Sequence, residues 1–219
     1  HDAIARAERR GFKPAVSADG SSVFYASAAT DLTAEGQAGL FLYDRLTGTN
    51  TRLPIGEWTD ERSISGDGAR MVIDTRQSHH AQDSNDRDDV YLWNRASGSI
   101  GWISQALGGI PGNGSSISPR ISADGNHVVF VSSSTNFEFS DANASADVFW
   151  VDLVTAERKL ISHVAGDPQT TSDGGSFDAV ISDDGNQVAF VSTATDLVAG
   201  RPTGDRRNVY LYDVPSGQM

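Results

Sequence analysis

The hydrophobic residues of this chain fall in short runs separated by turn-forming residues. Typical runs are Val128-Val129-Phe130-Val131 and Val188-Ala189-Phe190-Val191, and β-branched and aromatic residues dominate them. Apolar residues at consecutive positions, instead of alternate ones, are typical of short strands that are covered on both faces. Only about residues 3–10 have a composition that favours a helix, so the pattern predicts an all-β protein.

The turns follow a repeated signature, Ser-x-Asp-Gly, whose Gly residues lie 48 to 60 positions apart. An Asp-Gly pair between two apolar runs predicts a hairpin turn, because Gly adopts a positive φ without a steric penalty. The four copies are Ser17-Ala18-Asp19-Gly20, Ser65-Gly66-Asp67-Gly68, Ser122-Ala123-Asp124-Gly125 and Ser182-Asp183-Asp184-Gly185. In each copy an apolar segment precedes the turn and a stronger one follows it, so each turn joins two predicted strands.

A second strand signature follows each of these turns and ends in Asp or Asn, four residues before a further turn residue. The strands cover residues 40–44, 90–94, 148–152 and 209–213, and the turn residues are Gly48, Gly98, Ala156 and Gly217. Ala156 weakens the expectation of a left-handed turn in the third repeat, because Gly adopts that conformation most readily. A last strand follows this turn, so each repeat predicts four short strands.

A four-stranded sheet that is buried on both faces and repeated in series predicts the blades of a β-propeller. The predicted fold class is all-β, with four four-stranded blades in a single domain over residues 1–219. The repeats cover about residues 13–54, 61–104, 118–162 and 178–219. A two-sheet sandwich would instead show alternating patterns and no fixed period.

The fourth repeat ends before its last strand, which leaves two ways to complete the architecture. Residues 3–7 could supply that strand and close a ring of four blades. Alternatively, the chain forms part of a larger ring, which the rest of a longer chain or a second copy completes. An unclosed stack exposes blade faces at both ends, so the sequence predicts self-association if the ring does not close.

The fourth repeat carries the fullest form of the motif. It combines Ser182-Asp183-Asp184-Gly185 with Val188, Phe190 and Ser192, then Ala194-Thr195-Asp196-Leu197 and Tyr212-Asp213. The middle element recurs as Ala29-Thr30-Asp31-Leu32 and Ser134-Thr135-Asn136-Phe137, whereas residues 75–80 depart from it. Over nearly the whole chain this pattern resembles the TolB-like, WD-related β-propeller repeat of bacterial proteins. The resemblance implies a propeller in a periplasmic or extracellular setting, and it leaves the role open among scaffold, secreted binding module and accessory domain of a peptidase or lyase.

Composition and charge exclude several functions. The chain has 17 Lys and Arg against 29 Asp and Glu, a net charge of −12, and no Cys. Without Cys there is no disulfide framework, thiol nucleophile or Cys-based zinc site. An acidic chain without a basic block is a poor partner for nucleic acid, and no apolar run approaches the roughly 20 residues of a membrane helix. We therefore expect a protein or glycan partner, with no nucleic acid and no membrane insertion.

Two acidic loops form a candidate metal site with the spacing Asp-x-Asn-x-x-x-Asp. The candidate ligands are Asp83, Asn85 and Asp89 in the second repeat and Asp141, Asn143 and Asp147 in the third. Calcium prefers several hard oxygen ligands from a flexible loop, so calcium is the predicted cofactor. The alternative is that these Asp and Asn side chains form Asx turns and cap loop amides.

No linear catalytic motif is present, but a few residues could carry chemistry. His79-His80, near Asp83 in the divergent loop of the second repeat, could act in metal or acid–base chemistry, with an exposed loop as the plainer interpretation. Trp58 and Trp102 are candidate sugar-stacking platforms, with burial in the core as the alternative. The repeated Asp of Ser-x-Asp-Gly is interpreted as structural, because a catalytic residue is rarely duplicated in every repeat.

The sequence favours a non-catalytic, extracytoplasmic β-propeller module that binds or scaffolds a protein or glycan. Two alternatives remain. The chain could be the accessory propeller domain of a peptidase or polysaccharide lyase, because catalytic residues that converge from separate blades leave no linear motif. It could also be an assembly subunit that self-associates through its open blade faces.

Overall fold

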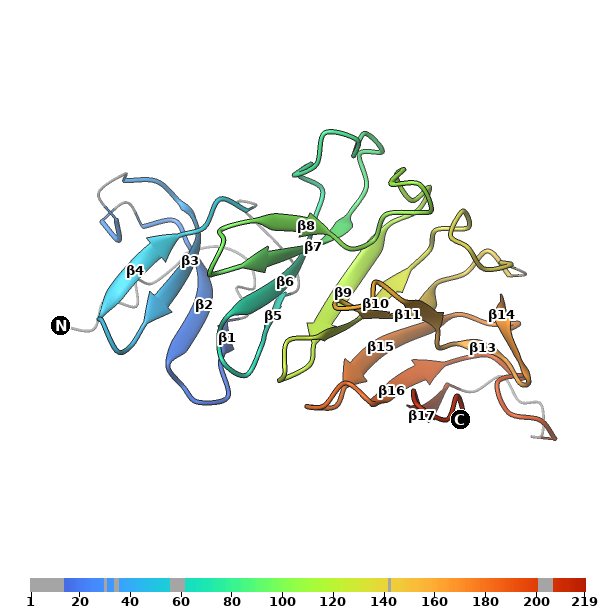
Figure 1. The fold of residues 1–219 in the computed structure, drawn as a ribbon. Helices are drawn as coiled ribbons and strands as arrows, with labels where there is room; N and C mark the ends of the chain where they lie inside the picture. Colours follow the sequence, from blue (N-terminus) through green and yellow to red (C-terminus); the bar gives the residue numbers. More distant parts are fainter. Residues whose placement is uncertain (1–13, 30, 34–35, 56–61, 142, 201–206) are drawn as a thin grey trace.

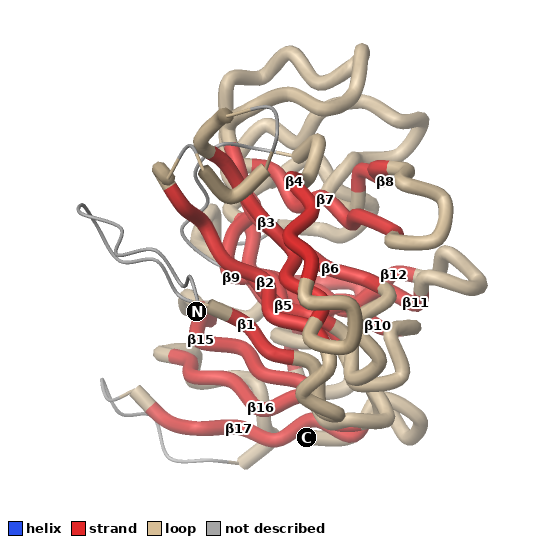
Figure 2. Tube along the Cα trace, turned by 90° about the vertical axis from the view of Figure 1, so that its left-hand side faces the viewer, coloured by secondary structure: helices blue, strands red, loops and turns tan. Residues whose placement is uncertain are grey.

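Antiparallel sheets make up the architecture. The structure is a computed structural model and describes residues 14–29, 31–33, 36–55, 62–141, 143–200 and 207–219. Over these residues it contains seventeen strands and no helix, which confirms the all-β prediction (Figure 2). None of the described segments is a helix long and apolar enough to cross a membrane. The predicted helix near residues 3–10 and the predicted closing strand over residues 3–7 lie outside the described residues.

Each repeat forms one sheet in which neighbouring strands follow chain order. Blade one consists of β1 (Ala15–Val16), β2 (Ser22–Ser27), β3 (Gly39–Asp44) and β4 (Thr49–Arg52). Blade two consists of β5 (Arg62–Ile64), β6 (Arg70–Thr75), β7 (Asp89–Asn94) and β8 (Ile100–Trp102). Blade three consists of β9 (Ser116–Ile121), β10 (His127–Ser132), β11 (Asp147–Asp152) and β12 (Arg158–Leu160).

Blade four has three strands, β15 (Ser176–Ile181), β16 (Gln187–Ser192) and β17 (Asn208–Asp213). Before it, β13 (His163–Val164) and β14 (Asp167–Thr171) form a separate hairpin that the repeat pattern did not predict. The hairpin is tied to the preceding blade, because Thr170 pairs with Ser140 in the loop between β10 and β11.

Consecutive blades pack face to face, and this packing forms the hydrophobic core. We call the side of a blade that meets the preceding blade its leading face, and the opposite side its trailing face. Leu40 and Leu42 on the trailing face of blade one share a core with Met71, Tyr91 and other leading-face residues of blade two. Two further cores join blade two to blade three and blade three to blade four. The first strands β1, β5, β9 and β15 contact one another in series (Figure 1).

The Ser-x-Asp-Gly turns hold each blade together internally and bind it to its neighbour. In blade one the Ser17 hydroxyl donates to Asp19 Oδ1 (2.6 Å) and accepts from the Ser22 amide (3.0 Å). The same contacts recur in the other three turns. Between blades the turns are joined by backbone hydrogen bonds, such as the one from the Gly66 amide to the Ala123 carbonyl (2.8 Å). These Asp side chains therefore have a structural role, as the sequence indicated.

Ala156 adopts the left-handed conformation that Gly has in the other repeats. Its φ is 62°, against 69° for Gly48, 67° for Gly98 and 68° for Gly217. The Ala156 amide donates to the Asp152 carbonyl at 2.9 Å, as the equivalent Gly amides do in their turns. The geometry of the repeat is thus retained, at the cost of a conformation that is unfavourable for a residue with a Cβ.

Among the described residues, no further blade packs on the trailing face of blade four. Val209 of β17 is 73% exposed, whereas Leu40, Val90 and Val148 at the same position of the third strand are each 0% exposed. Figure 1 places blade one and blade four at opposite ends of the row. Among the described strands, blade four shows no packing on blade one comparable with the packing between consecutive blades.

Candidate functional site

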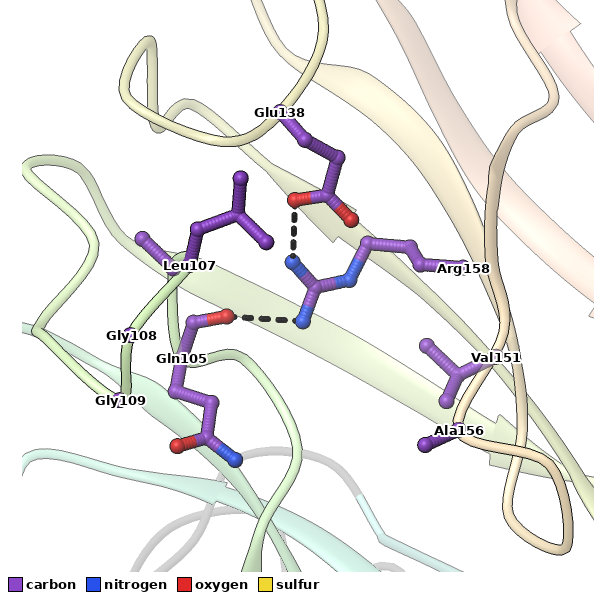
Figure 3. Close-up of a pocket in the computed structure, with 9 residues that line it drawn as sticks. Gln105, Leu107, Gly108, Gly109, Glu138, Val151, Ala156 and Arg158 are labelled. Atoms are coloured by element: carbon purple, nitrogen blue, oxygen red, sulfur yellow. Dashed lines mark hydrogen bonds and ion pairs between the residues drawn. The ribbon is translucent and has the colours of Figure 1, made fainter.

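A pocket of about 240 Å³ opens between blade three and the connection from β8 to β9, and Figure 3 shows it in close-up. Its walls come from the connection between β8 and β9, from the loop before β11, and from β11, β12 and the turn between them. The lining residues are Gln105, Ala106, Leu107, Gly108, Gly109, Glu138, Val151, Ala156 and Arg158. The pocket therefore depends on the packing of two blades and not on one loop.

Arg158 of β12 is the charged centre of this pocket and joins the two blades. Its Nη1 donates to Glu138 Oε2 at 3.0 Å (Figure 3), and its Nη2 donates to the carbonyl oxygens of Ile103 (3.0 Å) and Gln105 (2.8 Å). The guanidinium carbon lies 4.7 Å from the ring centroid of Phe137. The side chain is 11% exposed, so its orientation is fixed by four contacts in a largely buried site.

The charges of this pocket compensate each other. Burial lowers the pKa of Arg158, and the negative charge of Glu138 acts in the opposite direction. A guanidinium remains protonated in proteins, so the two side chains form an ion pair with no net charge. The ion pair therefore adds no net charge to the pocket.

The rim of the pocket is apolar and exposed. Leu107 is 69% exposed and Ile110 is 52% exposed. A bridge between Ala106 and Ile110 closes a tight loop, in which Gly108 and Gly109 have φ values of 78° and 74°. The positive φ values let the chain reverse over this short distance and leave Leu107 beside the pocket (Figure 3). Leu107 and Ile110 thus form a small exposed apolar surface next to the pocket.

The first predicted calcium loop, residues 83–89, is organised by its own hydrogen bonds. Asn85 Nδ2 donates to Asp89 Oδ2 (3.0 Å) and to the Gly112 carbonyl (2.9 Å), so Asn85 ties the loop to the connection that leads into blade three. The Tyr91 hydroxyl donates to Asp83 Oδ2. Asp89 is fully buried, and this burial raises its pKa. The structure thus brings Asn85 and Asp89 into direct contact, with Asp83 held by Tyr91.

The second predicted calcium loop, residues 141–147, repeats most of this arrangement. Asn143 Nδ2 donates to the Ser172 carbonyl in the connection to blade four, and Asp141 Oδ1 accepts from the Asn143 amide (3.0 Å). Asp147 is buried and accepts a hydrogen bond from Ser162 (2.8 Å), and burial raises the pKa of Asp147 to about 7.

Asn85, Asp141 and Asn143 accept hydrogen bonds from loop amides, as the alternative interpretation from the sequence expects, and the two Asn side chains also donate to the connection that leads to the next blade. No group of three or more His, Asp or Glu side chains suited to a metal ion is present over the described ranges. Calcium binding by either loop stays a prediction.

The aromatic and His candidates of the second repeat lie against one another, with Trp102 buried, His79 half-buried and His80 exposed, as the loop interpretation of the two His residues expects. Trp102 is 5% exposed and lies 5.4 Å from His80 and 6.4 Å from Tyr91, measured between ring centroids. The sugar-stacking interpretation of Trp102 is therefore wrong, and the core interpretation is confirmed. His79 packs edge-on against Tyr91 at 5.2 Å, and burial lowers the pKa of His79. Trp58 lies outside the described residues.

Sequence reasoning missed the pocket because its walls come from separate segments. Arg158 was visible only as part of a last strand, and Glu138 only as a loop residue. The available signal was Leu107-Gly108-Gly109-Ile110, in which two large apolar residues flank a Gly pair outside any predicted strand.

Comparison with known protein structures identifies the fold. No protein-family model matches the chain, and no curated protein matches it. TolB from Acinetobacter baumannii is 17% identical with a TM-score of 0.54, over 94% of this chain and 41% of that one. The putative TolB from Agrobacterium tumefaciens is 21% identical with a TM-score of 0.54, over 93% and 61%. The β-propeller domain of Cps50 (Swd1) from Myceliophteria thermophila is 12% identical with a TM-score of 0.54, over 98% and 55%.

The fold is that of a β-propeller, which confirms the fold class predicted from the sequence. Identities of this size establish the fold and leave the activity open. The chain spans 41% and 61% of the two TolB chains that it matches, which is less than two thirds of either.

Proposed function

We propose that this chain is a non-catalytic β-propeller module that binds a protein or glycan partner through the pocket between blades two and three. The observation that carries this proposal is the fixed, charge-compensated pair of Arg158 and Glu138 beside the exposed apolar residues Leu107 and Ile110. On the TolB-like resemblance of the sequence, we place the module in the periplasm or outside a bacterial cell.

The pocket suits a small, uncharged group that belongs to a larger partner. Its volume of about 240 Å³ is below the roughly 300–1,000 Å³ that is usual for complete small-molecule ligands. One side chain or one sugar ring is therefore the expected occupant, with the rest of the partner lying on the apolar rim. The carboxylate of Glu138, which lines the pocket, supplies an acceptor for an amide or hydroxyl donor.

A second candidate function is the accessory propeller of a peptidase or a polysaccharide lyase. In its peptidase form it is supported by matches to a prolyl endopeptidase and to dipeptidyl peptidase 4 of Porphyromonas gingivalis. These structures are 15% and 16% identical, and the chain spans 27% and 32% of them. In that case the same pocket would contact the substrate while the reaction takes place on another part of the protein.

Site-specific photo-crosslinking tests the binding proposal. A photoreactive residue at position 107 is compared with one at position 46, because Leu46 is an 81% exposed apolar residue in a hairpin turn of blade one. Both proteins are mixed with the extracytoplasmic fraction of the source cells and, separately, applied to a glycan array. We expect a saturable partner at position 107 that is absent at position 46 and is lost when Ile110 is also changed to Asp.

Equal adducts at both positions, or saturable binding in neither assay, would contradict the assignment of the pocket. Turnover of peptides or acidic glycans by the isolated chain would contradict the non-catalytic role and favour the enzymatic alternative.

A further inference from the structure

Reciprocal hydrogen bonds tie the connection into blade three to the loop that follows β10. The Asn113 amide donates to Asn136 Oδ1 (3.0 Å), and the Thr135 amide donates to Asn113 Oδ1 (2.8 Å). Asn113 Nδ2 donates to Thr135 Oγ1 (2.8 Å). Asn136 Nδ2 donates to the Pro111 carbonyl (2.9 Å). We call Asn113, Thr135 and Asn136 the blade-three latch, and its side chains carry no charge.

Blade four has the same arrangement with carboxyl groups in place of the two side-chain amides. The Asp173 amide donates to Asp196 Oδ1 (3.0 Å), and the Thr195 amide donates to Asp173 Oδ1 (2.6 Å). The Thr195 hydroxyl donates to Asp173 Oδ2. We call Asp173, Thr195 and Asp196 the blade-four latch. It repeats the backbone contacts of the blade-three latch and differs in the chemistry of two side chains.

The two carboxyl groups of the blade-four latch lie against each other. The side chains of Asp173 and Asp196 are within hydrogen-bonding range. An ionised carboxylate only accepts hydrogen bonds, whereas a protonated carboxyl group also donates one. A hydrogen bond between these two groups therefore requires a proton, and without that proton two negative charges are adjacent.

We propose that Asp173 and Asp196 share a proton and make the blade-four latch a pH-sensitive switch, which holds the connection into blade four more tightly at mildly acidic pH than at neutral pH. Loss of the proton removes the hydrogen bond between the carboxyl groups and leaves like charges side by side, so the latch weakens. This inference concerns a part of the molecule other than the pocket and does not depend on the proposed function.

The surroundings of the two carboxyl groups assign the proton to Asp196. Burial raises the pKa of Asp196, and the negative charge of Asp173 adds to this effect. Burial also opposes the ionisation of Asp173, but hydrogen bonds from the Thr195 hydroxyl and amide outweigh it and lower the pKa of Asp173. A raised pKa in the folded state adds stability below the unfolded value of about 3.9, and this stability is lost as the pH rises through the folded value.

Two other elements pack against the latch and carry titratable groups. Asn143 Nδ2 donates to the Gly174 carbonyl (3.3 Å), and the Ala165 amide donates to the Asp196 carbonyl (2.9 Å). The titratable side chains of residues 141–147 and 163–171 are Asp141, Asp147, His163 and Asp167. Asp141 acts on Asp147, and His163 acts on Asp167. A test of the proposal must therefore change Asp196 alone and leave these groups in place.

Amide hydrogen exchange of the 219-residue chain, followed by NMR, tests the proposal within one molecule. The Thr195 amide reports opening of the blade-four latch, and the Thr135 amide of the blade-three latch is the internal control. Protection is the observed rate relative to the intrinsic rate at the same pH. One pKa unit corresponds to a tenfold change in an equilibrium. We therefore expect protection of the Thr195 amide to be at least about threefold higher at pH 4.5 than at pH 7, with no such change at Thr135.

Two matched variants separate the shared proton from general effects of pH. Asp196→Asn supplies a permanent donor to Asp173, so it should abolish the pH dependence at Thr195. Asn113→Asp combined with Asn136→Asp places a carboxyl pair in the blade-three latch and should create the dependence at Thr135. These substitutions keep the shape of each side chain, and circular dichroism checks that the fold is retained.

The proposal is overturned if protection at Thr195 and Thr135 responds equally to pH, if Asp196→Asn leaves the response at Thr195 unchanged, or if the double variant creates no response at Thr135. A carboxyl carbon signal of Asp196 that titrates at or below about pH 3.9, the ordinary value for Asp, would also overturn it.

Discussion

Blade one and blade four carry the same trailing-face pattern and have opposite surroundings. Leu42 of β3 and Leu211 of β17 occupy the same position in the third strand, with exposed fractions of 3% and 55%. Leu42 is covered by blade two, whereas none of the described strands packs on Leu211 as blade two packs on Leu42. The strand pattern thus predicts which side chains are suited to burial, and packing against a neighbouring blade decides whether they are buried.

The largest expected effect is a difference between two identical substitutions. Leu42→Ala should lower the free energy of unfolding by about 2–5 kcal/mol, because it removes buried methyl groups and leaves a cavity. Leu211→Ala should change it by less than about 0.5 kcal/mol in dilute protein, because the side chain is exposed. Chemical denaturation measured by fluorescence gives both values.

Equal losses for the two variants would mean that the trailing face of blade four is covered in solution. Repeating the measurement at high protein concentration separates self-association from coverage within one chain, since only the former depends on concentration.

The central blades also differ from the end blades in their acidic loops, and calcium tests whether that difference has a function. If the loops at residues 83–89 and 141–147 bind calcium, a concentration of 100 times Kd should raise the free energy of unfolding by about 2.7 kcal/mol. Asp141→Asn should reduce the gain. Asp86→Asn is the matched control, because it removes the same charge from an acidic loop at a residue outside the predicted ligand set. A calorimetric titration without heat, together with an unchanged melting temperature, would rule the site out.

The third blade differs from the other three in one turn, and a smaller effect is expected there. Ala156→Gly should stabilise the protein by up to about 1 kcal/mol, because Gly relieves the cost of a φ of 62° but gains conformational freedom in the unfolded chain. Gly98→Ala in blade two should have the opposite sign, with a loss of about 1–2 kcal/mol. Thermal denaturation compares the two, and a loss for Ala156→Gly would show that packing at the pocket, which Ala156 lines, outweighs backbone strain.

The smallest expected effect concerns pH and a turn carboxylate that recurs in all blades. Hydrogen bonds from the Ser65 hydroxyl and the Ala69 amide lower the pKa of Asp67 in the folded protein. A pKa below that of the unfolded chain adds stability above about pH 4, and this stability is lost as the pH falls through the folded-state pKa. Asp67→Asn should therefore make unfolding less dependent on pH on the acid side, with little change in the slope near neutrality. An unchanged acid slope in denaturation at several pH values would contradict this role.

Much of the fold could be predicted from the sequence because its signals are local and repeated. An Asp-Gly turn and a run of β-branched residues specify a hairpin by short-range sterics, and four copies of that signal indicate a propeller. The hairpin of β13 and β14 was missed because it carries no copy of the repeat. The turn at Ala156 was doubted because the residue alone disfavours it, whereas the surrounding hairpin imposes it.

The candidate sites were less predictable, for a physical reason that Trp102 and Arg158 illustrate. Trp102 could be a surface platform or a core residue on sequence grounds, and the packing of blade two buries it at 5% exposure. The position of the Arg158 side chain is fixed by partners that are 20 and 55 residues away in sequence, Glu138 and the Ile103 carbonyl. Contacts between separate blades leave no linear motif.

The sequence by itself determined the all-β class, the repeated four-strand unit and the structural role of the Ser-x-Asp-Gly turns, because these depend on backbone conformation over a few residues. Only the tertiary structure decided which apolar faces of the described blades pack against each other and where the pocket of Arg158 lies. Whether a residue is buried depends on what packs against it. Leu42 and Leu211 therefore occupy the same place in the strand pattern but differ in solvent exposure, and so in how much hydrophobic burial stabilises them.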